Sequence, residues 1–141
     1  MLNYKTTSTY TALIAFTLFS ILILFPEMLF WLFGIEQSNS ALFVGRRMAM
    51  LFLGLATLLW VGRNAAHSES RQAISLSIAV SMCGLAGLGV FELLQGHAGP
   101  GILLAIFTEF VIAGLYFKLW LEHQNIEQNV GGETLPNAKG E

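Results

Sequence analysis

The chain has 141 residues, of which 55% are hydrophobic and 11% charged, and its formal net charge at pH 7 is −2. A soluble domain of average composition is about one quarter charged, so this chain has too little polar surface for a water-soluble globule. The composition indicates a membrane protein and argues against an ordinary cytosolic enzyme, and the absence of a basic stripe argues against nucleic acid as a partner.

Four apolar segments approach the roughly 20 residues that a bilayer core requires. None of them alternates between apolar and polar residues as a barrel strand would, so we predict helices. We expect an all-α integral membrane four-helix bundle formed by residues 1–121. The polar residues that follow, 122–141, are expected to form a short helical overhang and then a disordered cytoplasmic tail. The four predicted helices cover about residues 10–33, 41–61, 73–94 and 101–121.

The first predicted helix contains a proline. Lys5 and the apolar stretch after it could form a signal peptide, but no small-residue cleavage site follows, so we expect an uncleaved span. Pro26 either kinks a helix that continues to Phe33 or opens a new interfacial helix that ends at Gly34. We favour a kinked or broken helix whose last part lies near the membrane interface, where Trp31 fits.

The other helices have recognisable ends. Polar residues 38–40 and 68–70 offer N-caps to the second and third helices. The glycine-rich segment 96–101 must be the turn between the third and fourth helices. Aromatic residues near the end of the fourth helix, Tyr116 and Trp120, are typical of an interfacial belt.

Small residues recur at four-residue spacing along the third helix. This pattern indicates a close helix–helix contact, either within one chain or between two copies in a homo-oligomer. The only cysteine of the chain belongs to this stripe, and a single cysteine excludes an internal disulfide and a Cys-x-x-Cys site. The stripe consists of Ala79, Cys83 and Gly87.

Basic residues predict the orientation of the helices in the membrane. Four spans place both termini and the middle loop on one side. By the positive-inside rule we expect that side to be the cytoplasm and the membrane to be the bacterial inner membrane. Arg46 and Arg47, on the other side, count against this orientation. The basic residues on the expected cytoplasmic side are Lys5, Arg63, Arg71, Lys118 and Lys139.

Among the ionisable residues inside the predicted spans, four are the candidates for function: Arg46, Arg47, Glu92 and Glu109. A charge at mid-bilayer costs about 2.5–3.5 kcal/mol on insertion scales, so such residues are candidates for function. At about 1.5 Å per residue, all four lie within roughly 12 Å of the same membrane face. We therefore expect them to converge in the extracytoplasmic half of the bundle.

Their helical neighbours predict which way these side chains face. Glu109 has Ala105 and Ala113 one turn to either side, which favours an inward orientation. Arg46 and Arg47 differ by about 100° around the helix, so one is expected to face inward and the other to reach the headgroups.

Three functions remain open for these charges. Convergent polar groups in an apolar bundle suit a binding site for a lipophilic or amphipathic small molecule, such as a lipid or a quinone. Alternatively, an ion pair of Arg46 or Arg47 with Glu109 fixes helix packing in a structural or accessory subunit. A third possibility is a small proton-coupled transporter that uses Glu109.

Catalysis and metal binding are not favoured by the sequence. Glu92, His97 and Glu109 are suitable metal-ligand types, but their spacing matches no compact ligand motif. The chain contains no Asp, which excludes a Ser/His/Asp triad. We expect no metal and no cofactor, and membrane lipids as the surrounding partners. The sequence favours a non-enzymatic role and leaves enzymatic activity open.

Several residues together give the chain a resemblance to the DoxX-like group of small four-helix bacterial membrane proteins, closest to a family of unknown function. The resemblance covers about residues 10–121 and implies the same four-helix fold. Some DoxX-like proteins are associated with quinone-linked oxidation of sulfur compounds, but this chain has no redox cysteine pair. The residues that carry the resemblance are Phe25-Pro26, Gly34-Ile35, Arg46 or Arg47, Gly54 and Glu109.

Overall fold

The structure is a computed structural model that describes residues 3–66 and 68–133, with side chains described as far as Gln124 except that of His123. In this part of the chain there are five helices and no strand, which confirms the all-α prediction. The helices are α1 (Tyr4–Leu24), α2 (Pro26–Phe33), α3 (Asn39–Gly62), α4 (Glu69–Leu94) and α5 (Ile102–Glu133).

Four of these helices are long and apolar enough to cross a membrane: α1, α3, α4 and the part of α5 from Ile102 to Glu122. Their outward faces carry large apolar side chains, among them Leu51, Val61 and Phe107, which are each about two-thirds exposed or more. A soluble protein rarely exposes so continuous an apolar surface, whereas a lipid-facing surface requires it. The chain therefore has the architecture of a multi-pass membrane protein.

Helix α1 begins at Tyr4, earlier than predicted, although the residues there are polar. Asn3 caps the helix, because its side-chain oxygen accepts a hydrogen bond from the Lys5 amide at 3.1 Å. The Thr9 hydroxyl donates to the Lys5 carbonyl at 2.7 Å, and Thr11 donates to Thr7 at 3.0 Å. These polar side chains are satisfied within the helix, so they do not interrupt it.

The first predicted helix is broken at Pro26. Helix α1 ends at Leu24, Phe25 leaves the helical region with φ −140°, and Pro26 occupies the first turn of α2. Helix α2 ends at Gly34, whose left-handed conformation, with φ +69°, suits glycine. Of the two arrangements considered for Pro26, the structure has the one in which a new helix begins.

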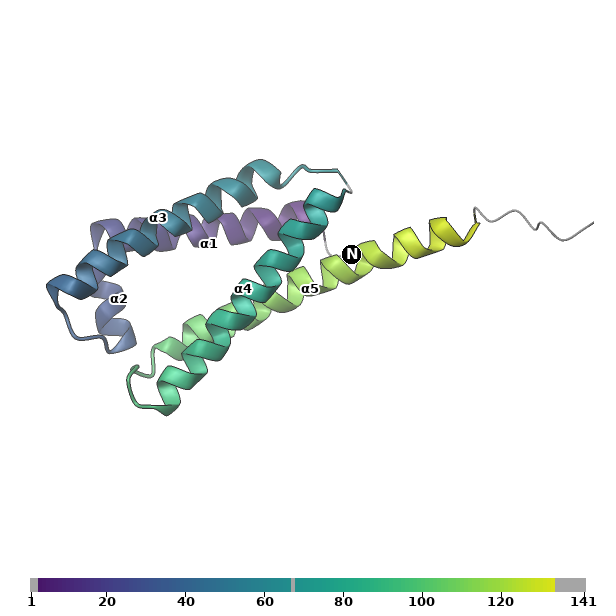
Figure 1. Cartoon of the computed structure of the whole chain (residues 1–141). Coiled ribbons are helices and arrows are strands. Elements are labelled where there is room, and N and C mark those ends of the chain that lie inside the picture. The colour runs from purple at the N-terminus through teal and green to yellow at the C-terminus, as the bar shows by residue number, and fades with distance from the viewer. Residues whose placement is uncertain (1–2, 67, 134–141) are drawn as a thin grey trace, which may run out of the picture.

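Helix α5 continues to Glu133, so its overhang beyond the membrane span is longer than the short one expected. The remainder of the predicted tail, residues 134–141, lies outside the described residues. The start of α1 and the last turns of α5 lie at the same end of the bundle (Figure 1). This agrees with an even number of spans.

The long helices form two antiparallel pairs (Figure 1). Helix α1 packs along α3, and α4 packs along α5. Gly89 allows the second pair to approach closely, since a Cβ there would lie 2.8 Å from Ile106 Cγ1. The two pairs converge near the start of α1 and diverge toward α2, which lies across the wider end (Figure 1).

Candidate functional site: a cavity between the helix pairs

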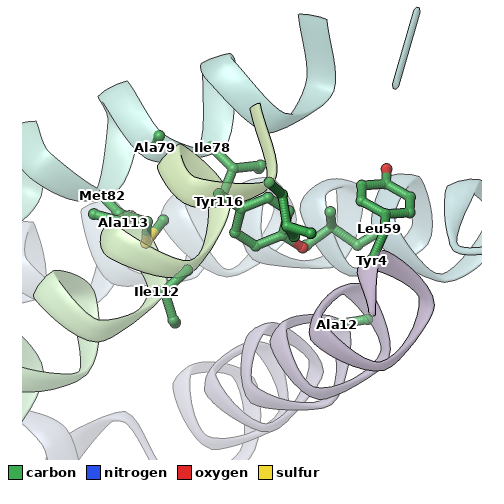
Figure 2. Close-up of a cluster of buried hydrophobic side chains, with 10 residues drawn as sticks. Tyr4, Ala12, Leu59, Ile78, Ala79, Met82, Ile112, Ala113 and Tyr116 are labelled. Carbon is green, nitrogen blue, oxygen red and sulfur yellow. The ribbon is translucent and has the colours of Figure 1, made fainter. Parts of the chain in front are cut away.

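At the narrow end, the two pairs are joined by a core of buried side chains (Figure 2). Tyr116 of α5 is 0% exposed, and its hydroxyl donates a hydrogen bond to Ser8 Oγ of α1 at 3.2 Å. Leu59 of α3 and Ile78 of α4 belong to the same core, so all four long helices meet here. The prediction that Tyr116 lies in an interfacial belt is wrong, because its ring and hydroxyl are both used inside the bundle.

At the wide end, the pairs are joined by backbone contacts instead. The Gly99 amide in the α4–α5 turn donates to the Phe33 carbonyl at 2.6 Å. A Cβ on Gly34 would lie 2.8 Å from the Gly99 amide nitrogen, and a Cβ on Gly101 would overlap the Leu32 carbonyl. Only glycine allows two backbones to approach this closely. These contacts hold α2 across the end of the bundle.

Between the two ends lies a cavity of about 190 Å³. All five helices contribute to its wall, and nearly all of the lining is apolar. Representative side chains, one from each helix in chain order, are Leu18, Leu29, Leu55, Met82 and Ile112. The cavity is therefore a product of the whole fold.

Three polar side chains reach this cavity: Thr11, Thr108 and Glu109. Both threonine hydroxyls donate to carbonyls of their own helix, Thr11 to Thr7 at 3.0 Å and Thr108 to Leu104 at 2.8 Å. Glu109 is half-buried and has neither an ion pair nor a hydrogen bond among the described residues. It is the only ionisable group in the wall, so its carboxyl group has its hydrogen-bonding capacity available to a guest molecule.

The other three predicted site residues lie elsewhere. Arg46 and Arg47 are exposed, and the Arg47 guanidinium lies 5.6 Å from the centre of the Phe43 ring. Gly45 and Ala49 are buried and occupy the packed face of α3, so the neighbouring arginines are turned outward. Neither arginine pairs with a carboxylate in the described part of the chain.

Glu92 lies near the end of α4, where its Oε2 is 2.9 Å from Nδ1 of His97. Both side chains are substantially exposed, so this contact belongs to the surface of the turn. Of the four residues expected to converge, only Glu109 lines the cavity. Within the described residues, no group of three or more His, Cys, Asp and Glu side chains is placed to hold a metal ion.

A second hollow lies beside the cavity, along the α1–α5 seam. A groove of about 380 Å³ lies there and shares Thr11, Ile14, Thr108 and Ile112 with the cavity wall. The α5 side of the groove is apolar except for Thr108, whereas most of its α1 side consists of threonines. The groove and the cavity are therefore neighbours on the same two helices.

Comparison of the chain with protein-family models, with curated proteins and with solved structures finds no match. The interpretation of the candidate site therefore depends on the geometry of the site alone. Sequence reasoning missed Thr11, Thr108 and the role of α2 in closing the cavity. Thr108 could have been found beside Glu109, whereas the position of α2 depends on contacts with a turn far along the chain.

Proposed function

We propose that this protein binds a lipophilic or amphipathic small molecule in the cavity between its helix pairs. The observation that carries the proposal is Glu109, an ionisable side chain without a described partner in an otherwise apolar wall. An unpaired carboxyl group inside a membrane span lowers stability, which makes such a group a candidate for function. A few polar groups in a mainly apolar cavity are the usual form of a small-molecule site.

The size of the cavity limits the part of the ligand that it can enclose. A cavity of roughly 150 Å³ in another protein holds benzene, so about 190 Å³ suits a single six-membered ring with a small substituent. A longer apolar tail could lie in the neighbouring α1–α5 groove. The shape therefore favours a compact polar head on an apolar chain.

The carboxyl group in the cavity wall limits which polar headgroup a ligand can have. A carboxylate with no cation beside it repels a phosphate group, which argues against a phospholipid head in this cavity. A protonated carboxyl group can donate a hydrogen bond to a carbonyl, and an ionised one can accept from a hydroxyl. A quinone, or a lipid that lacks phosphate, fits this chemistry best.

Native mass spectrometry of protein released from mild detergent tests the proposal. We expect one phosphate-free lipophile per chain in the wild type and in the control variant Glu36→Gln, whose side chain is exposed between α2 and α3. Glu109→Leu, which removes the hydrogen-bonding group at this position, should lose this molecule. A molecule retained equally by Glu109→Leu, or no molecule in the wild type, would overturn the proposal.

The same experiment identifies the two alternative functions. A bare homo-oligomer or a co-purified protein would favour a structural or accessory subunit. Ala79 is buried against α5, but Cys83 and Gly87 are exposed and available to a second copy. Proton-driven flux in proteoliposomes that is lost in Glu109→Gln would favour the transporter.

We also propose membership of the DoxX-like group and a bacterial inner-membrane location with both termini in the cytoplasm. Four spans, Phe25-Pro26 at the start of α2 and Glu109 within α5 support this assignment. Reporter fusions at the C-terminus test the orientation. Activity of a cytoplasm-dependent reporter is expected, and activity of a periplasm-dependent reporter would reverse the assignment.

A further inference from the structure

A second pocket, of about 240 Å³, lies at the narrow end of the bundle, where three chain segments meet. Its wall contains three basic side chains: Lys5 in the first turn of α1, Arg63 at the end of α3 and Arg71 in the first turn of α4. No Asp or Glu lines it. Three positive charges from three helices are thus gathered without a neutralising partner in the wall.

Two of these cations are held in place by neighbouring groups. The Arg63 guanidinium lies 3.7 Å from the centre of the Trp60 ring and donates to the Trp60 carbonyl at 2.8 Å. The Arg71 guanidinium lies 4.2 Å from the centre of the Tyr4 ring. Cation–π contacts orient a guanidinium while leaving most of its N–H donors available. The N-termini of α1 and α4 add positive potential at the same end, and the C-terminus of α3 offsets part of it.

The hydroxyl of Tyr4 is the second observation that indicates a ligand in this pocket. Tyr4 also lines this pocket, is only 2% exposed, and its hydroxyl has no hydrogen-bond partner in the described structure. In Figure 2 the hydroxyl points away from Tyr116, whose own hydroxyl bonds to Ser8. A buried polar group without a partner is costly, and such groups in native structures need an explanation. A ligand that accepts a hydrogen bond from the Tyr4 hydroxyl explains why this hydroxyl has no partner within the protein.

We propose that this pocket binds an anionic phosphate group. The unprotonated oxygens of a phosphate group accept hydrogen bonds, and the Tyr4 hydroxyl and the cations Lys5, Arg63 and Arg71 supply donors and a positive charge that favour such an anion. The group can belong to the head of an acidic phospholipid or to free phosphate. The pocket lies at the end of the spans, at the depth of headgroups. In the predicted orientation it faces the cytoplasmic leaflet, where anionic lipids attract basic side chains.

This proposal is independent of the function proposed for the cavity, because the two sites share no residue and prefer opposite charges. The site at Glu109 excludes phosphate, and the pocket at Tyr4 requires it. Either proposal can therefore fail without affecting the other.

The experiment measures binding of three probes to the full chain in a neutral detergent: phosphatidylglycerol, phosphatidylcholine and inorganic phosphate. Native mass spectrometry follows the lipids, and isothermal titration calorimetry follows phosphate. We expect phosphatidylglycerol to bind at least about tenfold more tightly than phosphatidylcholine, because only the former has a net negative charge. Binding of inorganic phosphate in addition would identify free phosphate as a ligand, and its absence would identify the lipid.

Variants with matched controls locate the site. Tyr4→Phe should weaken binding of the anionic probe about tenfold, the loss expected for one hydrogen bond to a charged group, while Tyr10→Phe should have no effect. The double variant Arg63→Gln/Arg71→Gln should weaken it about a hundredfold. Arg46→Gln/Arg47→Gln, at the opposite end of α3, serves as the control for lost charge.

Tyr4→Phe also distinguishes an effect on ligand binding from an effect on the stability of the fold. Because the hydroxyl is buried without a partner, its removal should leave the Tm of the ligand-free protein unchanged or raise it. The proposal is overturned if Tyr4→Phe binds the anionic probe within twofold of the wild type. It is equally overturned if the control arginine pair lowers binding as much as Arg63 and Arg71 do.

Discussion

The two ends of the cavity join the same two helix pairs by different means. At the narrow end, side chains around Tyr116 interlock in a core with contributions from four helices. At the wide end, the backbone at Gly34 and Leu32 touches the backbone of the α4–α5 turn at Gly99 and Gly101. A side-chain core can relax around a substitution, whereas a backbone contact has no rotamer to change. The wide end should therefore be the less tolerant of the two.

The strongest test of this difference is a methyl group at the wide end. Gly101→Ala should destabilise the protein by about 3 kcal/mol, because the new Cβ would overlap the Leu32 carbonyl and move α2. Thermal unfolding in detergent measures the effect. Gly114→Ala, within α5, is the control: a Cβ there meets nothing within 4 Å, so the stability of this variant should be equal to that of the wild type or higher by up to about 1 kcal/mol. Equal Tm values for Gly101→Ala and the wild type would contradict the claim that the wide end tolerates substitution less well than the narrow end.

A smaller effect is expected from the hydrogen bond at the narrow end. Tyr116→Phe leaves the buried Ser8 hydroxyl without its partner and should cost about 1–2 kcal/mol. The double variant Tyr116→Phe/Ser8→Ala should recover part of this loss, since neither group is then left unpaired. Tyr10→Phe removes an exposed hydroxyl and should change little. Additive losses in the double variant would show that the two hydroxyls do not interact.

The carboxyl group between the two ends should contribute nothing to stability. Glu109→Gln removes a charge that has no described partner in an apolar wall, so the Tm of the ligand-free protein should stay the same or rise. Thermal unfolding of protein stripped of bound lipid measures this. A clear fall in Tm would mean that Glu109 is a structural group, as the ion-pair interpretation holds.

The smallest effect is expected at the surface pair of Glu92 and His97. His97→Ala should change the free energy of unfolding by less than about 1 kcal/mol, because both side chains are substantially exposed. Chemical denaturation of the variant beside the wild type is the appropriate measurement. A larger loss would show that the α4–α5 turn depends on this contact as well as on its glycines.

The helices and the facing of Glu109 could be predicted because both depend on local sequence. Apolar runs give the spans, and Ala105 and Ala113 beside Glu109 indicate an inward face. The same logic did not identify the facing of the arginines. The sequence predicts that one of the two arginines faces inward, but Gly45 and Ala49 form the packed face of α3, which leaves Arg46 and Arg47 exposed.

Contacts between residues far apart in the chain could not be predicted from local pattern. In the sequence, Tyr116 resembles an interfacial aromatic residue. In the structure, its hydroxyl donates to Ser8, which lies near the other end of the chain. In the sequence, Gly99 and Gly101 resemble ordinary turn glycines. In the structure, both lie against α2 and its C-cap. A hydrophobic pattern reports which residues avoid water, and it does not report which helix each face will meet.

The most direct test of the account is whether filling the cavity abolishes ligand binding. The measurement is the rise in Tm when a short-chain benzoquinone is added to the wild type and to Ala105→Phe, which places a ring in the cavity wall. At a ligand concentration of about 100 times Kd, binding stabilises the folded state by about 2.7 kcal/mol, so the wild-type Tm should rise by several degrees. The filled variant should fold without the quinone and show no rise. An equal rise in both proteins would contradict the claim that the ligand lies between the helix pairs.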